Sequence, residues 1–572
     1  MSVEKHLPFN RPLVSHADPF FWVALISLNA LLFLPAMLFL DLGNLFSVNL
    51  EVSFALLLWV IFSTRWQKNG LNQFWHAFLF LLYFALIYKS YASVLLGVYQ
   101  MQPNFYNDAS FIANGLPFLL SALDLPTWYY LAFIVAILSL FAFLWHFTKA
   151  LLVKRAAKIG RVTQMLAVSL GTVLLLYSGI SLGIDAELPT GVNSLVAETQ
   201  QNLSASRASY QNIDAFIAQN PYATYDYAQY DLAEKPNIYI IFFESYGSVL
   251  YKREHFRPAF TQMATAFETR LADEGWKAVS AFSEAPTWGG GSWMSYTSAL
   301  FGIGVSEQSQ YMALREQYAQ VPYPNMGRYF QTQGYEYLWV VPINRKLSLK
   351  YQQTDYAFYG ADRWITYDTL DYAGPLYGWG PSPPDQYTFG FIQNLLQKQT
   401  QPTFLFFLTQ DSHYPWVPLP ERVDDWQTLA NSDATGGSLS SEEKDDLSVF
   451  AARKNYLAAI EHSFENIADF ITEFDDPNAL IVLIGDHQPP TVSREDDGFE
   501  TMLHIISQDE DFLANFQNDG FEKSILLKND EVQLKHAGFY SLFIRNFLAR
   551  YGHNPKNLPP YLAEGLKNQE SK

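Results

Sequence analysis

Polar residues with metal-binding side chains follow two strongly apolar runs of this sequence. Glu244 ends the run 237–243, and Asp486 and His487 end the run 479–485. Both runs are rich in β-branched and aromatic residues, which is typical of a strand buried on both faces. In open α/β sheets, ligands collect at the carboxyl ends of the parallel strands. We therefore expect these three side chains to meet at one sheet edge and to form a cation site.

A glycine-rich turn supplies a candidate nucleophile. Three consecutive glycines, residues 289–291, precede Ser292, which opens an expected helix. Glycine lets the backbone approach a ligand closely, and the free N–H groups of a helix N-terminus favour an alkoxide and bind phosphate. The same pattern also fits a purely structural role, with Ser292 as an N-cap that contributes about 1 kcal/mol. A purely structural role fits the other three residues as well. Glu244 and Asp486 would then cap helices, and His487 would be an ordinary loop histidine.

A third apolar run, 404–408, leads into Asp411 and His413. His413 could contact a phosphoryl oxygen or protonate a leaving group, or it could be an ordinary loop histidine. The nucleophile also has rivals, because Thr287, Ser295 and Thr297 lie close to Ser292 in the sequence.

These motifs, in this order, resemble the alkaline-phosphatase/sulfatase superfamily, and most closely its lipoteichoic acid synthases and membrane phosphoglycerol transferases. The resemblance covers residues 235 to about 551. It implies one divalent metal, Mn²⁺ in most members with Zn²⁺ or Mg²⁺ as alternatives, held by Glu244, Ser292, Asp486 and His487. It also implies that His413 touches the substrate phosphate.

Three differences from known family patterns bear on the chemistry. The transferases usually carry Thr where this chain has Ser292, although Ser292 keeps the family's distance to Leu300-Phe301-Gly302. The Pro and Arg that sulfatases need after a formylglycine precursor are absent, which argues against sulfatase activity. The region 341–364 offers Arg345 as a substrate-binding residue but no histidine. Asp411 and His536 could furnish part of a second metal site, but we expect a single metal.

The resemblance implies transfer of a phosphoglycerol group from a phospholipid, with phosphatidylglycerol preferred, to a cell-envelope glycan or polymer through a covalent phosphoryl-serine intermediate. The first alternative is a phosphoethanolamine transferase. Those enzymes commonly carry disulfides, and this chain has no cysteine. A membrane-anchored hydrolase and a non-catalytic receptor are the remaining alternatives. The formal net charge of −19 argues against a nucleic-acid partner.

Apolar residues are concentrated in the first third of the chain. Five segments have the length and apolarity of membrane helices, namely 20–40, 52–63 with its flanks, 74–99, 128–147 and 165–182. Lys and Arg follow the second and fourth segments and are missing from the other two loops. Under the positive-inside rule the N-terminus is cytoplasmic and everything after residue 182 lies outside. This predicts a multi-pass protein of the bacterial cytoplasmic membrane with a periplasmic or extracellular catalytic domain.

The expected organisation is a five-helix membrane bundle (1–183), a stalk (184–234), an α/β sulfatase-like domain (235–551) and a polar, disordered tail (552–572). Within the stalk, residues 196–218 could be helical. Strand and helix patterns alternate through the third part, which predicts a mainly parallel central sheet flanked by helices. Lys89, inside the third membrane segment, is expected to face a neighbouring helix or the lipid headgroups.

Overall fold

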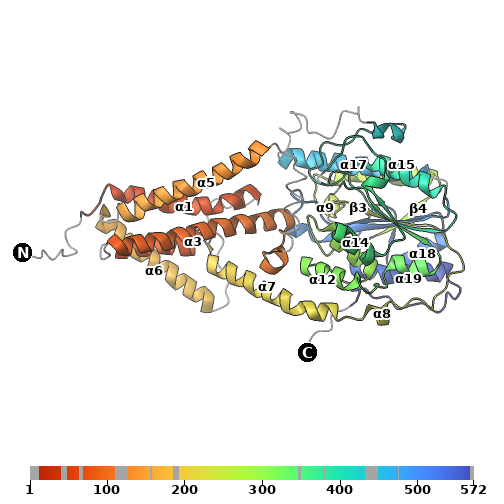
Figure 1. Cartoon of the computed structure of the whole chain (residues 1–572), viewed down its shortest axis with the longest axis horizontal. Coiled ribbons are helices and arrows are strands. Elements are labelled where there is room, and N and C mark those ends of the chain that lie inside the picture. Colours follow the sequence, from red (N-terminus) through yellow and green to blue (C-terminus); the bar gives the residue numbers. More distant parts are fainter. Residues whose placement is uncertain are drawn as a thin grey trace, which may run out of the picture. The chain divides into compact units, whose positions relative to one another are not determined.

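The computed structural model describes residues 12–39, 48–63, 68–109, 112, 127–154, 158–183, 192–344, 349–378, 380–431, 449–473 and 476–566. The chain divides into two compact units (Figure 1). The first consists of Met1–Phe105 and Asp124–Ser206, and the second of Tyr106–Leu123 and Arg207–Lys572.

The first unit is helical. Its elements are α1 (Ala17–Phe39), α2 (Leu50–Phe62), α3 (Lys68–Val94), α5 (Thr127–Lys149), α6 (Arg161–Gly183) and the first part of α7 (Leu195–Ile217), with a short parallel pair β1 (Val48–Asn49) and β2 (Val192–Asn193). Many large apolar side chains on α5 are exposed, such as Leu131, Phe133 and Leu138. An outward apolar surface of this kind is typical of a helix in contact with lipid.

The described part of this unit does not confirm the five predicted membrane spans. Three stretches are long and apolar enough to cross a membrane: Ala17–Met37, Asn69–Gly97 and Thr127–Lys154. The other two predicted spans correspond to the shorter apolar helices Leu50–Phe62 and Arg161–Leu174. A spanning helix needs about 20 apolar residues. The helix α2 has only 13 residues. The predicted span 165–182 lies entirely within α6, of which the stretch Arg161–Leu174 is found among the shorter apolar helices.

Contacts made by Lys89 and Glu51 anchor the start of α7 within the first unit. Lys89 Nζ lies 2.5 Å from Glu198 Oε1, and the Lys89 side chain is only 10% exposed. The Glu51 carboxylate accepts hydrogen bonds from the backbone N–H groups of Leu195 and Val196, at 2.8 and 3.0 Å. A carboxylate at a helix N-terminus satisfies N–H groups that have no partner within the helix. Within the region predicted as a stalk, the first turn of α7 is therefore fixed to this unit.

The second unit is built on a nine-stranded sheet with the order β10-β4-β9-β8-β3-β7-β5-β6, in which β11 also pairs with β4. The strands are β3 (Ile238–Phe243), β4 (Lys277–Glu284), β5 (Glu336–Val341), β6 (Arg363–Thr366), β7 (Thr403–Leu408), β8 (Leu480–Gly485), β9 (Glu500–Ser507), β10 (Glu522–Lys523) and β11 (Val532–Lys535). Five neighbouring strands, β6-β5-β7-β3-β8, are parallel, whereas β9 is antiparallel to both β8 and β4, and β10 is antiparallel to β4. The sheet is therefore mixed.

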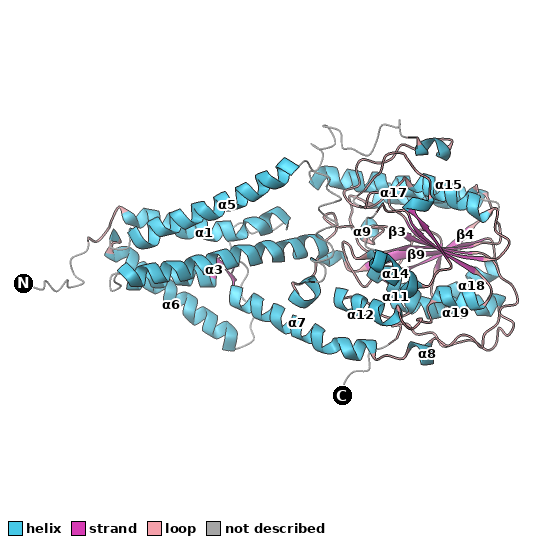
Figure 2. Cartoon of the chain, in the orientation of Figure 1, coloured by secondary structure: helices cyan, strands magenta, loops and turns pink. Residues whose placement is uncertain are grey.

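Helices cover both faces of this sheet (Figures 1 and 2). One face carries α10 (Arg257–Asp273), α15 (Asp385–Leu396) and α17 (Val449–Thr472). The other carries α11 (Ser292–Phe301), α12 (Gln308–Tyr318), α13 (Met326–Thr332), α14 (Leu349–Tyr359), α18 (Glu510–Asn518) and α19 (His536–Tyr551). The short helices α8 (Pro221–Thr224) and α9 (Val249–Lys252) lie in the connections.

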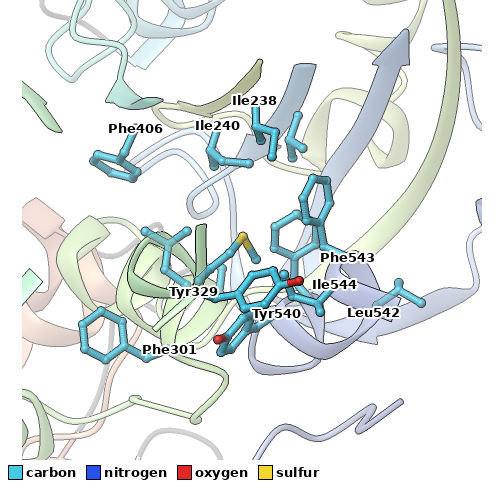
Figure 3. Packing of buried hydrophobic residues seen from close by; sticks show 14 of the residues in the cluster. Ile238, Ile240, Phe301, Tyr329, Phe406, Tyr540, Leu542, Phe543 and Ile544 are labelled. Atoms are coloured by element: carbon cyan, nitrogen blue, oxygen red, sulfur yellow. The ribbon is translucent and has the colours of Figure 1, made fainter. Parts of the chain in front are cut away.

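The central strands alternate between two hydrophobic cores. In β3, Ile238, Ile240 and Phe242 belong to one core, whereas Tyr239 and Ile241 belong to the other. Figure 3 shows Ile238 and Ile240 of β3 facing Tyr540 and Phe543 of α19. Burying each such side chain contributes about 1.5–3 kcal/mol. A strand that is apolar on both faces can only be stable between two helical layers.

The tail beyond α19 is ordered as far as the structure describes it. Leu566 forms a bridge with Ile303, and its backbone N–H donates to the Gly302 carbonyl at 2.7 Å. The expectation of a disordered tail does not hold for residues 552–566, because apolar side chains such as Tyr561 and Leu562 pack on the core. Residues 567–572 lie outside the described part.

Candidate active site

The ends of two adjacent parallel strands bring the predicted metal ligands together. Phe243 of β3 pairs with Gly485 of β8, so the residues that follow each strand are neighbours. Glu244, Asp486 and His487 are all at least 98% buried. One ligand atom from each lies within 4.8 Å of the others. The strands end here because the next residues are polar and turn away from the sheet, Ser245 with a left-handed φ of 59°.

Ser292 completes this cluster from a different element. It is the first residue of α11, and the preceding Gly291 has φ = 79°. Ser292 Oγ lies 3.2 Å from Glu244 Oε2 and 3.3 Å from His487 Nε2. All four residues predicted to hold the metal are therefore in contact.

Backbone groups fix the orientation of Asp486 and His487. Asp486 Oδ1 accepts hydrogen bonds from the N–H groups of Ser245 and His487, at 2.8 and 2.7 Å. His487 Nδ1 lies 2.9 Å from the Gln488 carbonyl oxygen. Because a carbonyl oxygen only accepts, Nδ1 carries a proton, and Nε2 is the ring nitrogen that faces the cluster.

The cluster has the donor set and the electrostatic imbalance of a cation site. Asp486 Oδ2 is buried and has no hydrogen-bond partner. It lies 3.3 Å from His487 Nε2, and Glu244 Oε1 lies 3.6 Å from the same nitrogen. Burial, followed by the nearby Asp486 charge, raises the pKa of Glu244 well above its ordinary value. A divalent cation would give these lone pairs a partner and balance the two carboxylates, and oxygen and nitrogen donors suit Mn²⁺, Zn²⁺ or Mg²⁺.

The rival hydroxyls have other partners. Ser295 Oγ donates to the Asp486 backbone carbonyl, and Thr287 Oγ1 lies 3.3 Å from Ser295 Oγ. Thr297 Oγ1 lies 3.2 Å from the Tyr359 hydroxyl. All three rivals are buried. Of the four candidates, Ser292 is the one whose hydroxyl contacts both Glu244 and His487.

Of the two predicted substrate-binding residues, the structure describes His413. His413 lies in the turn after β7 and is half-buried, with Nδ1 2.7 Å from the Tyr414 carbonyl oxygen. Its role at a substrate phosphate stays a prediction. Arg345 lies outside the described residues.

Asp411 and His536, the candidates for a second metal site, belong to separate networks. Asp411 Oδ2 accepts from the Asp385 N–H at 3.1 Å, and His462 Nε2 lies 3.0 Å away. His536 Nδ1 lies 2.8 Å from Ser283 Oγ, and its Nε2 lies 3.0 Å from the carbonyl oxygen of Gly485. Within the described ranges, Glu244, Asp486 and His487 form the one group of three acidic or histidine ligands close enough to share an ion.

Sequence reasoning missed the side chains that support this site. Asp385 is fully buried, and burial followed by the Asp411 charge raises the pKa of its carboxyl group well above the ordinary value. Neither Asp385 nor His462 ends a strand or belongs to a motif, so the sequence contains no signal for them. Thr409 and Ser412 directly follow β7, and their position at a strand end was the available clue.

Comparison with known proteins shows what this chain is similar to. No curated protein sequence matches this chain. The phosphoethanolamine transferase EptA of Neisseria meningitidis is 13% identical, with 93% of this chain and 95% of that chain covered and a TM-score of 0.47. The lipoteichoic acid synthase LtaP of Listeria monocytogenes is 15% identical, with 52% of this chain and 71% of that chain covered and a TM-score of 0.34. The phosphoglycerol transferase GacH of Streptococcus pyogenes is 13% identical, with 60% and 81% covered and a TM-score of 0.35.

The family model named Sulfatase matches residues 236–522, half of the chain. This stretch contains β3, α11, β7 and β8 and with them every described residue of the candidate site. The chain therefore belongs to the sulfatase family.

Proposed function

We propose that this protein transfers a phosphoglycerol group from a phospholipid to a hydroxyl group of a cell-envelope glycan or polymer. The observation that carries the proposal is the position of Ser292. Its hydroxyl oxygen sits at a helix N-terminus, 3.2 Å from Glu244 Oε2 and 3.3 Å from His487 Nε2, beside two buried carboxylates that need a cation. A serine in this setting is suited to attack phosphorus.

Glu244, Asp486 and His487 would hold one divalent metal, with Mn²⁺ as our first choice. Bound there, the cation would lower the pKa of the Ser292 hydroxyl and stabilise charge on the phosphoryl oxygens. The protein's own contribution is positional. The parallel register of β3 with β8 sets two of the ligands side by side, and the first turn of α11 delivers the hydroxyl.

The proposed reaction has two balanced halves. In the first, a bond forms between Ser292 Oγ and phosphorus, while the bond from phosphorus to the diacylglycerol oxygen breaks. Ser292 gives its proton to water, and the diacylglycerol oxygen takes a proton from His413. In the second half, an acceptor hydroxyl gives its proton to His413 and bonds to phosphorus, the Ser292 Oγ–phosphorus bond breaks, and Ser292 takes a proton from water.

Membrane attachment fits a lipid donor. A helical unit with three stretches able to span a membrane keeps the second unit at the bilayer that contains its substrate. We propose that the second unit lies on the outer side of the cytoplasmic membrane, as the distribution of Lys and Arg between the loops favours.

The test is diacylglycerol release by the purified full-length protein in detergent micelles. Phosphatidylglycerol and phosphatidylethanolamine are compared as donors, each with Mn²⁺, with chelator, and with the Glu244→Gln variant. We expect release from phosphatidylglycerol that requires the metal and is lost in the variant. Thr388→Val, a buried substitution on α15, serves as the matched control.

Other outcomes separate the alternatives. Release from phosphatidylethanolamine alone would make the protein a phosphoethanolamine transferase. Release of free glycerol phosphate that is unchanged by added glycan would make it a hydrolase. Absence of release from both lipids, in protein that carries metal, would contradict the proposed enzyme activity.

A further inference from the structure

The backbone of Glu244 is held on both sides by one loop. Its N–H donates to Thr409 Oγ1 at 3.0 Å, and its carbonyl oxygen accepts from Ser412 Oγ at 2.8 Å. Thr409 and Ser412 are both 0% exposed. They belong to the turn that follows β7, the strand next to β3 in the sheet. Two side chains therefore replace the backbone partners that Glu244 would have had if the strands continued.

This loop is in turn fixed to the start of α15. The Asp385 carboxylate accepts from the N–H groups of Gln410 and Asp411, each at 2.9 Å. The Asp411 carboxylate accepts from the Asp385 N–H at 3.1 Å and lies 3.0 Å from His462 Nε2. Asp385 and Asp411 thus bind each other's backbone, which ties the turn to a helix in the core.

Glu244 needs such support because of where it lies. The ladder between β3 and β8 ends at Phe243 and Gly485, and Ser245 already has a left-handed backbone. Nothing in the sheet itself fixes the peptide groups of Glu244. At the same time ligand atoms of its buried carboxylate and of Asp486 lie within 4.8 Å of each other, and two like charges at this distance disfavour their own close approach.

We propose that Thr409 and Ser412 are positioning residues that set the metal affinity of the site by clamping the backbone of Glu244. The inference rests on the proposed metal site and adds to it a group of residues that do not touch the metal. A metal ligand that its neighbours hold in place loses less conformational entropy when the metal binds. Mutation of residues that hydrogen-bond metal ligands typically lowers metal affinity 10- to 100-fold.

The test measures the Kd for Mn²⁺ by titrating the full-length protein and following the electron paramagnetic resonance signal of free Mn²⁺. Thr409→Val keeps the shape of the side chain but removes the acceptor for the Glu244 N–H, and we expect it to weaken binding about tenfold. Thr409→Ser keeps the hydroxyl and should bind within about twofold of the native protein. Thr403→Val is the matched control, since Thr403 is also buried but lies at the opposite end of β7, and its hydroxyl has no hydrogen-bond partner.

The thermal unfolding midpoint of each chelator-treated variant shows whether it is folded. Ser412→Ala removes the second half of the clamp and replaces Thr409→Val if that variant does not fold; it should also weaken binding about tenfold. Native affinity in folded Thr409→Val or Ser412→Ala protein would overturn the clamp. Equal weakening by Thr409→Ser and Thr409→Val would also overturn it, because packing rather than the hydrogen bond would then be the cause.

Failure of the metal site is a separate result. If the native protein does not bind Mn²⁺, or if Glu244→Gln binds it as tightly as the native protein, the proposed metal site is wrong. The proposed role of Thr409 and Ser412 is then refuted as well. If Glu244→Gln loses binding while the clamp variants do not, the metal site stands and only the clamp is refuted.

Discussion

Some residues of this site destabilise the folded protein. Glu244 and Asp486 are two buried carboxylates with a shared environment, and the raised pKa of Glu244 records the free energy that their ionisation costs in the absence of a cation. Polar groups that are unsatisfied in the folded protein alone are common where a ligand supplies the missing partner. The arrangement is therefore better explained by binding than by stability.

His536 gives a prediction about pH at the same scale. Burial lowers the pKa of this histidine from 6.5 to about 4, so the folded protein binds fewer protons than the unfolded chain between these two values. Stability must then rise with pH across this window and fall as the pH is lowered through it, by up to about 1.4 kcal/mol per pH unit for one proton. We expect His536→Gln to flatten the decline of the unfolding midpoint between pH 6.5 and pH 4.

The control for this experiment is His553→Gln, because His553 is exposed. Thermal unfolding of the chelator-treated protein, followed by intrinsic fluorescence at several pH values, provides the measurement. A native pH profile in His536→Gln protein, with the same slope below pH 6.5, would show that His536 does not titrate as a buried neutral group.

The residues of the site were predictable to different degrees. Glu244, Asp486 and His487 directly follow apolar runs, so the sequence shows where their strands end. Ligands bind at the carboxyl ends of parallel strands, which made these residues predictable. Ser292 was distinguishable from Thr287 and Ser295 only by resemblance, since all of them lie near one glycine-rich turn. The structure separates them by their hydrogen-bond partners.

At the scale of elements, the turn before α11 decides where the Ser292 hydroxyl lies. Gly291 has φ = 79°, and a Cβ atom placed there would lie 2.7 Å from Met294 Cε. Gly291→Ala should destabilise the turn by about 1–3 kcal/mol and displace Ser292. Gly304→Ala is the matched control, because a Cβ there would meet nothing within 4 Å.

We expect Gly291→Ala to lower the rate of lipid turnover at least about tenfold. A displaced Ser292 hydroxyl would raise the activation free energy by about 1.4 kcal/mol or more. Gly304→Ala should leave it unchanged. Initial rates of diacylglycerol release, with the unfolding midpoint measured in parallel, test both. Full activity in folded Gly291→Ala protein would mean that the turn does not position the nucleophile.

Strand direction and helix length were the element-level features that the sequence left open. The pattern of β9 is that of a buried strand, but nothing local says that it runs antiparallel between β8 and β4. That choice depends on connections and on packing partners far away in the sequence. Helix length was also not evident from the sequence. The apolar composition around α2 suggested a membrane span, although the helix has only 13 residues.

At the scale of the whole molecule, the account requires the second unit to lie outside the cytoplasm. The chain has no cysteine, so a single introduced cysteine is the only site for a thiol reagent. A membrane-impermeant maleimide should label Gln102→Cys in intact cells. It should label Lys158→Cys only after the cells are permeabilised, because the positive-inside rule places that loop in the cytoplasm. The reverse pattern would invert the proposed topology.

The central claim is that Ser292 becomes covalently phosphorylated during transfer. The most direct measurement is peptide mass spectrometry of the full-length protein after incubation with Mn²⁺ and phosphatidylglycerol, beside a Ser292→Ala variant treated in the same way. The account predicts a glycerol-phosphate adduct on Ser292 that is missing from the variant. An adduct on Thr287 or Ser295, or an unmodified Ser292 in protein that is releasing diacylglycerol, would contradict it.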